Sequence, residues 1–280
     1  MGIDTHSLHL LRYATHKFGR LGNTITLGRL TVLLGPRASR QLLGTSVGAY
    51  CEPLLKQHFG ASKVDSIDNS AYEGANIVAD MNRPLPTALE GQYDAVIDFG
   101  CTEHIFDIAQ ALRNVTSICK LGGLILHAVP ANGFCGHGFY QFSPELFFSC
   151  YSEANGYSDT EVFLADLCDT QNWFRVTLPK YGKRINVRSP GELYVLVVTK
   201  RVAARNETVQ QSDYEHTWAQ SNSAVAPPHP PGRMARAREV LSKTTLSARL
   251  AYTLDAALAP NGAKRLRHHH ALTRVPLAKM

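Results

Sequence analysis

Polar residues stand at the ends of several short apolar runs of this sequence. Asp68, Asp80 and Asp98 each close such a run, and His104 follows Asp98 closely. In an open parallel sheet, ligands bind beyond the carboxyl ends of the strands. A carboxylate accepts two hydrogen bonds at once, so an acid after the second strand suits both hydroxyls of a ribose. Asp68 fits that role, although a turn aspartate at a strand end is an equally good interpretation of the residue alone.

The segment 132–141 combines three glycines, one histidine and three aromatic residues. This composition is typical of a shaped loop at the mouth of a site. His137 is suited to accept the proton of a hydroxyl group, because its pKa lies near neutrality. Phe139, Tyr140 and Gln141 are the candidates for contacting a flat or ring-shaped acceptor. Alternatively, the aromatic side chains pack the loop onto the sheet and His137 bonds a backbone carbonyl.

The pair Glu103-His104 supplies a second candidate base. His104 has the right chemistry for proton transfer, and Glu103 caps or orients its neighbours; the pair can equally belong to the scaffold. With Asp98 and Asp107 it forms a group of oxygen and nitrogen donors close in sequence, but without the spacing of a dedicated cation cage. The six scattered cysteines include no CxxC pair. We therefore expect no metal.

Runs with strand and helix periodicity alternate over the first 200 residues. Strands are predicted at 23–28, 63–68, 76–80, 93–98, 124–129, 158–164 and 193–199. Helices are predicted over the first 20 residues, at 49–58, at 106–121 before Gly122-Gly123, and from Ser143 to Asn155-Gly156. This alternation predicts an α/β fold with a doubly wound, mostly parallel, Rossmann-like sheet.

Composition divides the chain of 280 residues and 30.8 kDa into four parts. We expect an N-terminal helix at 1–22, the main domain at 23–200, a polar and proline-rich linker at 201–232, and a basic helical tail at 233–280. Residues 201–280 hold 12 Lys and Arg against 5 Asp and Glu, a balance of +7, so residues 1–200 carry a balance of −1 within the net charge of +6. The main domain is neutral and offers no electrostatic reason to bind nucleic acid.

The tail has two interpretations. A basic amphipathic helix can contact an anionic membrane surface. Alternatively, its apolar stripe packs on its own domain or on a second subunit of a homo-oligomer. No apolar run approaches the roughly 18 residues that cross a bilayer. The first residues lack a basic stretch followed by an apolar one, so we expect no secretory signal, reduced cysteines and a cytoplasmic protein.

Taken in order, several motifs resemble the class I S-adenosylmethionine-dependent methyltransferases. They are Asp68-Asn-Ser, Asp80, the run YDAVID at 93–98 followed by Glu103-His104, and LGGLILHAVP at 121–130. The stretch Tyr72-Glu-Gly-Ala, together with GHGFYQFSPE at 136–145, is similar to a bacterial subgroup associated with polysaccharide and surface-glycan synthesis. The resemblance covers roughly residues 20–200.

The resemblance implies S-adenosyl-L-methionine as cofactor, with Asp68 and Asn69 at the ribose and Asp80 and Met81 beside the adenine. It further places Gly28, Asp98, Phe99 and Gly100 around the methionine part. One departure is clear: the family's glycine-rich loop after the first strand, usually GxGxG, is replaced by Thr26-Leu-Gly-Arg-Leu.

Three functions remain open from the sequence. The first is O-methylation of a sugar hydroxyl in a glycan or its precursor, with His137 or His104 as the base. The second is O-methylation of a small secondary metabolite. The third, favoured by the missing glycines, is a non-catalytic methyltransferase-like partner in a glycan-assembly complex.

Overall fold

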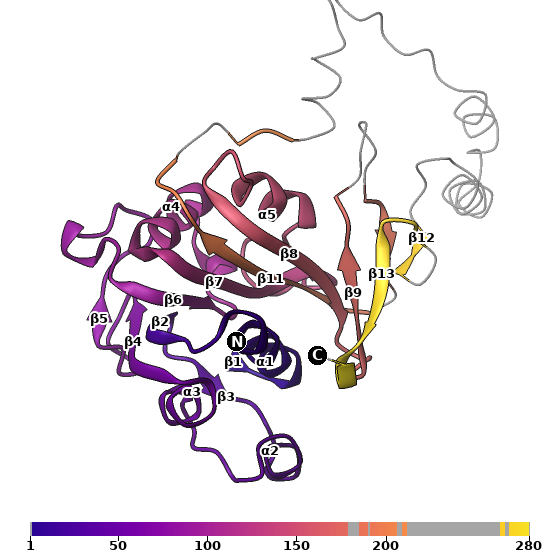
Figure 1. The fold of residues 1–280 in the computed structure, drawn as a ribbon, viewed down its shortest axis with the longest axis horizontal. Coiled ribbons are helices and arrows are strands. Elements are labelled where there is room, and N and C mark those ends of the chain that lie inside the picture. The colour runs from indigo at the N-terminus through magenta and orange to yellow at the C-terminus, as the bar shows by residue number, and fades with distance from the viewer. Residues whose placement is uncertain are drawn as a thin grey trace, which may run out of the picture.

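A nine-stranded sheet organises the residues that the computed structural model describes, namely 2–178, 185–189, 191–205, 209–211, 264–266 and 269–279 (Figure 1). Its strand order is β13-β9-β8-β11-β7-β6-β2-β4-β5. The strands are β2 (Gly22–Leu27), β4 (Ala61–Asp68), β5 (Ile77–Val78), β6 (Tyr93–Asp98), β7 (Cys119–Asn132), β8 (Tyr157–Asp166), β9 (Asn172–Val176), β11 (Leu193–Arg201) and β13 (Leu272–Pro276).

The predicted direction of the sheet is confirmed. Strands β5, β4, β2, β6 and β7 pair in parallel, and their order is that of a doubly wound sheet. Strand β11 runs antiparallel to both β7 and β8, so β8 again points the same way as β7. Strand β9 is reversed against β8 and β13. The sheet is therefore mostly parallel, with two reversed strands on the β7 side.

Helices cover both faces of this sheet (Figure 1). Helices α1 (Thr5–Phe18) and α3 (Cys51–Phe59) share one core with Ala95 and Ile97 of β6. Helices α4 (Ile108–Ile118) and α5 (Pro144–Cys150) share the other core with Val96. Successive side chains of a strand point to opposite faces, which is why neighbours in β6 serve different cores.

The first crossover of the sheet carries the insertion that separates Gly28 from Asp68. Helix α3 is the crossover helix, closed by Gly60 as its left-handed cap. Ahead of it lie β3 (Thr31–Val32), which pairs with β1 (Gly2–Ile3), and α2 (Pro36–Leu43). The smaller elements β10 (Val187–Arg188) and β12 (Lys264–Arg265) pair with each other.

Two helix ends were predicted wrongly. Helix α4 ends at Ile118, and Gly122-Gly123 lies inside β7, where the pairing with β6 slips and Gly122 takes a φ of 85°. These glycines allow an irregularity in a strand instead of stopping a helix. Helix α5 ends at Cys150, and the side chain of Asn155 reaches back from the following turns to donate to the carbonyl of Ser149 at 3.1 Å.

The end of the predicted helical tail is a strand. The proline-rich linker and the helical pattern at 234–258 lie outside the described residues. Residues 272–276, in contrast, form β13 and pair with β9, and Leu277 joins the core of the α1 face. An unpaired edge strand needs a partner, and β13 supplies one for β9. No helix in the described ranges has the length and apolar character to span a membrane.

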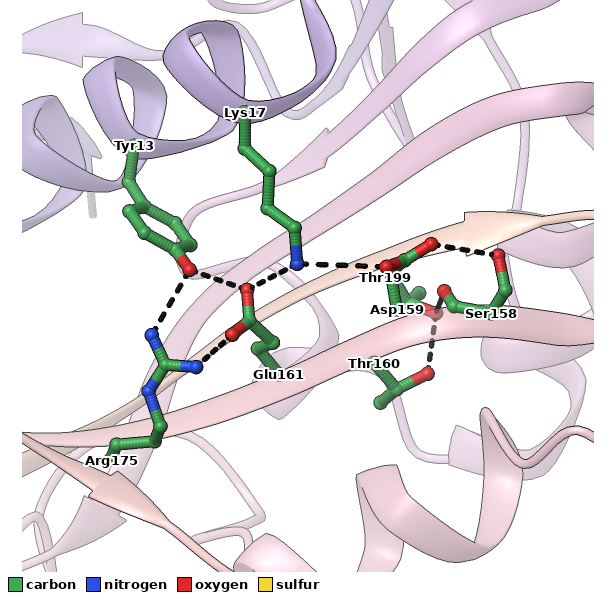
Figure 2. Close-up of polar contacts among 8 residues, drawn as sticks. All are labelled: Tyr13, Lys17, Ser158, Asp159, Thr160, Glu161, Arg175 and Thr199. Atoms are coloured by element: carbon green, nitrogen blue, oxygen red, sulfur yellow. Dashed lines mark hydrogen bonds and ion pairs between the residues drawn. The ribbon is translucent and has the colours of Figure 1, made fainter. Parts of the chain in front are cut away.

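One carboxylate joins α1 to the sheet (Figure 2). Glu161 of β8 accepts hydrogen bonds from the Tyr13 hydroxyl at 2.5 Å and the Lys17 ammonium at 2.9 Å. It also pairs with Arg175 of β9. Burial and the hydrogen bond to Glu161 raise the pKa of Tyr13 to about 12. A single side chain thus connects one helix with two strands.

We expect Glu161→Gln to lower the free energy of unfolding by about 1–3 kcal/mol, because it weakens hydrogen bonds to a charged group. Urea denaturation followed by circular dichroism measures the change. The matched control is Asp159→Asn, since Asp159 lies 3.7 Å from Lys17 and is about half exposed; such a pair contributes about 0–1 kcal/mol. Equal effects of the two substitutions would contradict the role assigned to Glu161.

Candidate active site

A cavity of about 360 Å³ lies beyond the carboxyl ends of β2, β4, β5 and β6. At this point the strand order reverses, because β4 lies on one side of β2 and β6 lies on the other. Ligands of doubly wound sheets usually bind at such a point. Six of the eight residues predicted to bind the cofactor line it: Gly28, Asp68, Asn69, Asp80, Met81 and Gly100.

Asp68 and Gly28 lie next to each other in the wall of this cavity, at the ends of the paired strands β4 and β2. A Cβ placed on Gly28 would lie 3.8 Å from Asp68 Oδ2, and Gly28 takes a φ of 70°, a conformation that glycine adopts without strain. Asp68 Oδ1 receives a long bond of 3.4 Å from the backbone N–H of Ser70. Oδ2 accepts no hydrogen bond within the described part of the chain, so it is free to receive one from a ligand.

Asp80 and Arg29 also line the cavity, but both are engaged. Asp80 accepts two bonds from Asn82, which hold the pKa of its carboxyl below the ordinary range. The Arg29 guanidinium lies 3.8 Å from the centre of the Tyr50 ring and pairs with Glu52 at 2.7 Å. Arg29 was not assigned to the site from the sequence, although its position directly after Gly28, the glycine that follows β2, was an available signal.

Two residues predicted to line the methionine part do not line the cavity. Asp98 is fully buried and pairs with His127 Nδ1 at 2.7 Å; it also accepts bonds from the Thr102 hydroxyl and the Cys101 backbone. Burial opposes its ionisation, but these bonds outweigh burial and the pKa of Asp98 is lowered. Phe99 packs into the core of the α1 face. Both side chains therefore support the site from inside the fold.

The three predicted catalytic residues meet beside this cavity. Glu103 Oε1 lies 3.4 Å from His137 Nε2 and 3.8 Å from His104 Nε2, and the two imidazole rings are 4.8 Å apart. Burial and the charge of Asp98 raise the pKa of Glu103 to about 8. Burial and the neighbouring His137 lower the pKa of His104. His104 belongs to the cluster and to the cavity wall alike.

The loop that carries His137 is held against Glu103 by its backbone. The N–H groups of Phe139 and Tyr140 both donate to the Glu103 carbonyl, at 2.7 and 3.3 Å. Gly138 has a φ of 70°, and a Cβ there would lie 2.7 Å from that carbonyl oxygen. The glycine therefore permits the close approach that brings His137 to Glu103.

The three residues predicted to contact an acceptor differ in their availability. Gln141 Oε1 accepts the backbone N–H of Phe134 and so braces the loop. The Tyr140 hydroxyl donates to the Phe106 carbonyl at 2.7 Å. Phe139 is 66 % exposed and makes an edge-to-face pair with Phe106, which is 74 % exposed. Phe106 was missed because its sequence position suggested a helix start.

A larger cavity, of about 680 Å³, lies between α4, α5 and the segment after β11. Its described lining contains no histidine and no carboxylate. It also lies away from the strand ends that carry Asp68 and the Glu103 cluster. We therefore place the candidate site at the smaller cavity.

No family model and no curated relative matches this chain. Among solved structures it is similar to the 1,6-didemethyltoxoflavin-N1-methyltransferase of Burkholderia thailandensis, with 14 % identity over 69 % of this chain and 77 % of that one and a TM-score of 0.38. It is also similar to TehB of Haemophilus influenzae, with 11 % identity, coverage of 68 % and 61 %, and a TM-score of 0.39. A third similar structure is a SAM-dependent methyltransferase of Archaeoglobus fulgidus, with 13 % identity over 71 % of this chain and 95 % of that one and a TM-score of 0.42. Because these scores all lie under 0.5, we infer the function from the geometry of the site.

We expect Gly138→Ala to loosen residues 133–142, because the added Cβ would displace the Glu103 carbonyl and strain a left-handed residue. Hydrogen exchange at the amides of Phe139 and Tyr140 measures the effect. Gly136→Ala is the control, since a Cβ at Gly136 meets nothing within 4 Å. Unchanged protection in Gly138→Ala, or equal loss in both variants, would contradict this account of the loop.

Proposed function

We propose that this protein binds S-adenosyl-L-methionine in the cavity at the strand ends and transfers its methyl group to an acceptor hydroxyl. The observation that carries the proposal is the position of His104, which lines the Asp68 cavity and also belongs to the cluster with Glu103 and His137. A cofactor cavity and a group able to handle an acceptor proton are thereby adjacent. The cavity volume lies in the ordinary range for small-molecule sites.

The residues of the cavity have separate roles in this proposal. Asp68 accepts hydrogen bonds from both ribose hydroxyls, one through its unengaged oxygen Oδ2 and one through Oδ1. Asp80 and Met81 flank the adenine. Gly28 and Gly100, both with positive φ, let the backbone approach the methionine part closely.

The reaction exchanges one bond for another at the methyl carbon. The acceptor oxygen attacks the methyl group, the carbon–sulfur bond breaks, and S-adenosylhomocysteine leaves without the sulfonium charge. The hydroxyl proton passes to the cluster, with His137 as the first candidate and His104 as the second. The protein contributes chiefly by holding the donor and the acceptor in line.

The exposed pair Phe106 and Phe139 supports a ring-shaped acceptor. The two side chains stand next to the loop of His137 and offer apolar ring surface to a ligand. We propose a sugar hydroxyl of a glycan or glycan precursor; a small-molecule hydroxyl would use the same contacts. The alternative, a partner without catalysis, is favoured by Arg29, which stands where the family has a glycine-rich loop and pairs with Glu52 of α3.

Asp68→Ala should weaken binding of S-adenosylmethionine about 30-fold, because hydrogen bonds to a charged group contribute about 2 kcal/mol. Isothermal titration calorimetry measures the dissociation constant. Asp94→Asn is the control, since Asp94 lies at the opposite end of β6 and pairs with Lys120. If the wild-type chain binds no S-adenosylmethionine, or Asp68→Ala binds it equally well, the cofactor assignment fails.

His137→Ala should lower methyl transfer about 100-fold while leaving cofactor affinity unchanged, because a base acts on the acceptor and not on the cofactor. Transfer of labelled methyl to a panel of monosaccharides and nucleotide sugars provides the assay. His58→Ala, at an exposed residue of α3, is the control. Loss of activity in His104→Ala alone would move the base to His104, and full activity in both variants would remove the cluster from the reaction.

A further inference from the structure

Three donor atoms converge next to the cavity without forming hydrogen bonds. Glu103 Oε1 is 3.4 Å from His137 Nε2 and 3.8 Å from His104 Nε2, and one ligand atom from each residue lies within 4.8 Å of the others. These distances exceed those of ordinary hydrogen bonds. Two ligands at about 2.0–2.1 Å from a zinc ion, in tetrahedral geometry, lie about 3.4 Å from each other. The Glu103–His137 distance equals that spacing, and the exposed His104 side chain lies 3.8 Å from Glu103 and needs only a small shift to complete the set.

The burial of these atoms distinguishes the cluster from a solvated acidic patch. The Glu103 side chain has no exposed surface, and neither of its carboxylate oxygens has a hydrogen-bond partner among the described residues. His137 Nε2 is likewise buried and without such a partner. A buried polar atom that lacks a partner is unfavourable, and one cation would satisfy all three atoms together.

We propose that Glu103, His104 and His137 bind one divalent transition-metal ion. Two imidazole nitrogens and one carboxylate are a ligand set that suits Zn²⁺ or Fe²⁺ and disfavours Mg²⁺, which prefers oxygen ligands. Three protein ligands leave at least one coordination position for a bound water or a substrate. His104 has a side chain that is 48 % exposed and lines the cavity, so an ion held by this cluster would lie beside the proposed cofactor site.

The fold holds the ligands in place before any ion arrives. Glu103 and His104 share the short 3-10 turn at 102–104, whose first residue is bonded to Asp98 at 2.7 Å. His137 is brought to them by the two loop N–H groups that donate to the Glu103 carbonyl. Such fixed support is characteristic of metal sites, in which outer contacts orient the ligands.

If the protein transfers a methyl group to a hydroxyl, as proposed above, the ion would help to remove the proton of that hydroxyl. An acceptor hydroxyl that coordinates a divalent cation loses its proton more readily. The hydroxyl proton would pass to solvent, and the acceptor oxygen would take the methyl group as the carbon–sulfur bond breaks. With the ion bound, His137 and His104 would assist the loss of the acceptor proton as metal ligands, in place of the direct role as base given to them above.

Zinc titration of the full chain tests the site without reference to activity. The parent protein for this titration carries His268→Gln and His270→Gln, because three consecutive histidines at 268–270 can bind zinc themselves. A chelator first removes any bound metal. Calorimetry should show one Zn²⁺ per chain and no binding of Mg²⁺. Glu103→Gln and His137→Gln should each weaken zinc binding by about 10- to 100-fold, while His58→Gln should leave it unchanged.

Two outcomes would overturn the proposal: the absence of stoichiometric zinc binding, or equal affinity in Glu103→Gln and the parent protein when circular dichroism shows both folded. A second readout separates this failure from that of the proposed function. Co²⁺ bound at the site absorbs visible light, and S-adenosylhomocysteine should shift that absorption if the cofactor occupies the adjoining cavity. Zinc binding with no response to S-adenosylhomocysteine would support the metal site and count against the cofactor.

Discussion

Asp98 ends the central strand β6 with no exposed surface, and the site depends on the bonds that its carboxylate makes. It pairs with His127 of the neighbouring β7, which in turn bonds the Tyr151 hydroxyl beyond α5 at 2.7 Å. Its other contacts hold the turn of Cys101 and Thr102. A buried ionised group is tolerated only when it is well paired, so these partners constrain one another. The turn that carries Glu103 and His104 is thereby fixed to the sheet.

The constraint extends from that turn in two directions. On one side, His104 forms part of the wall of the cavity that Asp68 and Gly28 also line. On the other side, the Glu103 carbonyl receives the loop of residues 133–142 and places His137 within reach of the Glu103 carboxylate. The charge of Asp98 also helps to raise the pKa of Glu103 to about 8. Cavity, cluster and aromatic loop are thus positioned by one buried carboxylate.

The sequence predicted the sheet well because its strands have a strong local signal. Residues 93–98 were predicted as a strand and form one with the same bounds. Strands β9 and β13 were missed, because each has only five residues and β13 pairs with a strand about 100 residues earlier in the chain. Local periodicity cannot reveal such a distant pairing. The same limit explains the helical prediction for the end of the chain.

The candidate site was predicted residue by residue, but its assembly was not. Glu103, His104 and His137 were each named for chemistry that suits their side chains, yet nothing local shows that a loop 34 residues away returns to Glu103. Asp98 was placed at the methionine part of the cofactor on the resemblance to the methyltransferases. Its side chain instead meets His127 in the interior, and only the pairing of β6 with β7 reveals that contact.

A crystal structure of the chain with S-adenosylhomocysteine would test the central claim most directly. The account predicts the adenosine in the cavity at the strand ends, with both ribose hydroxyls within hydrogen-bond distance of the Asp68 carboxylate and the sulfur directed toward His104. Density for the ligand in the cavity between α4 and α5, or a ribose without contact to Asp68, would contradict it.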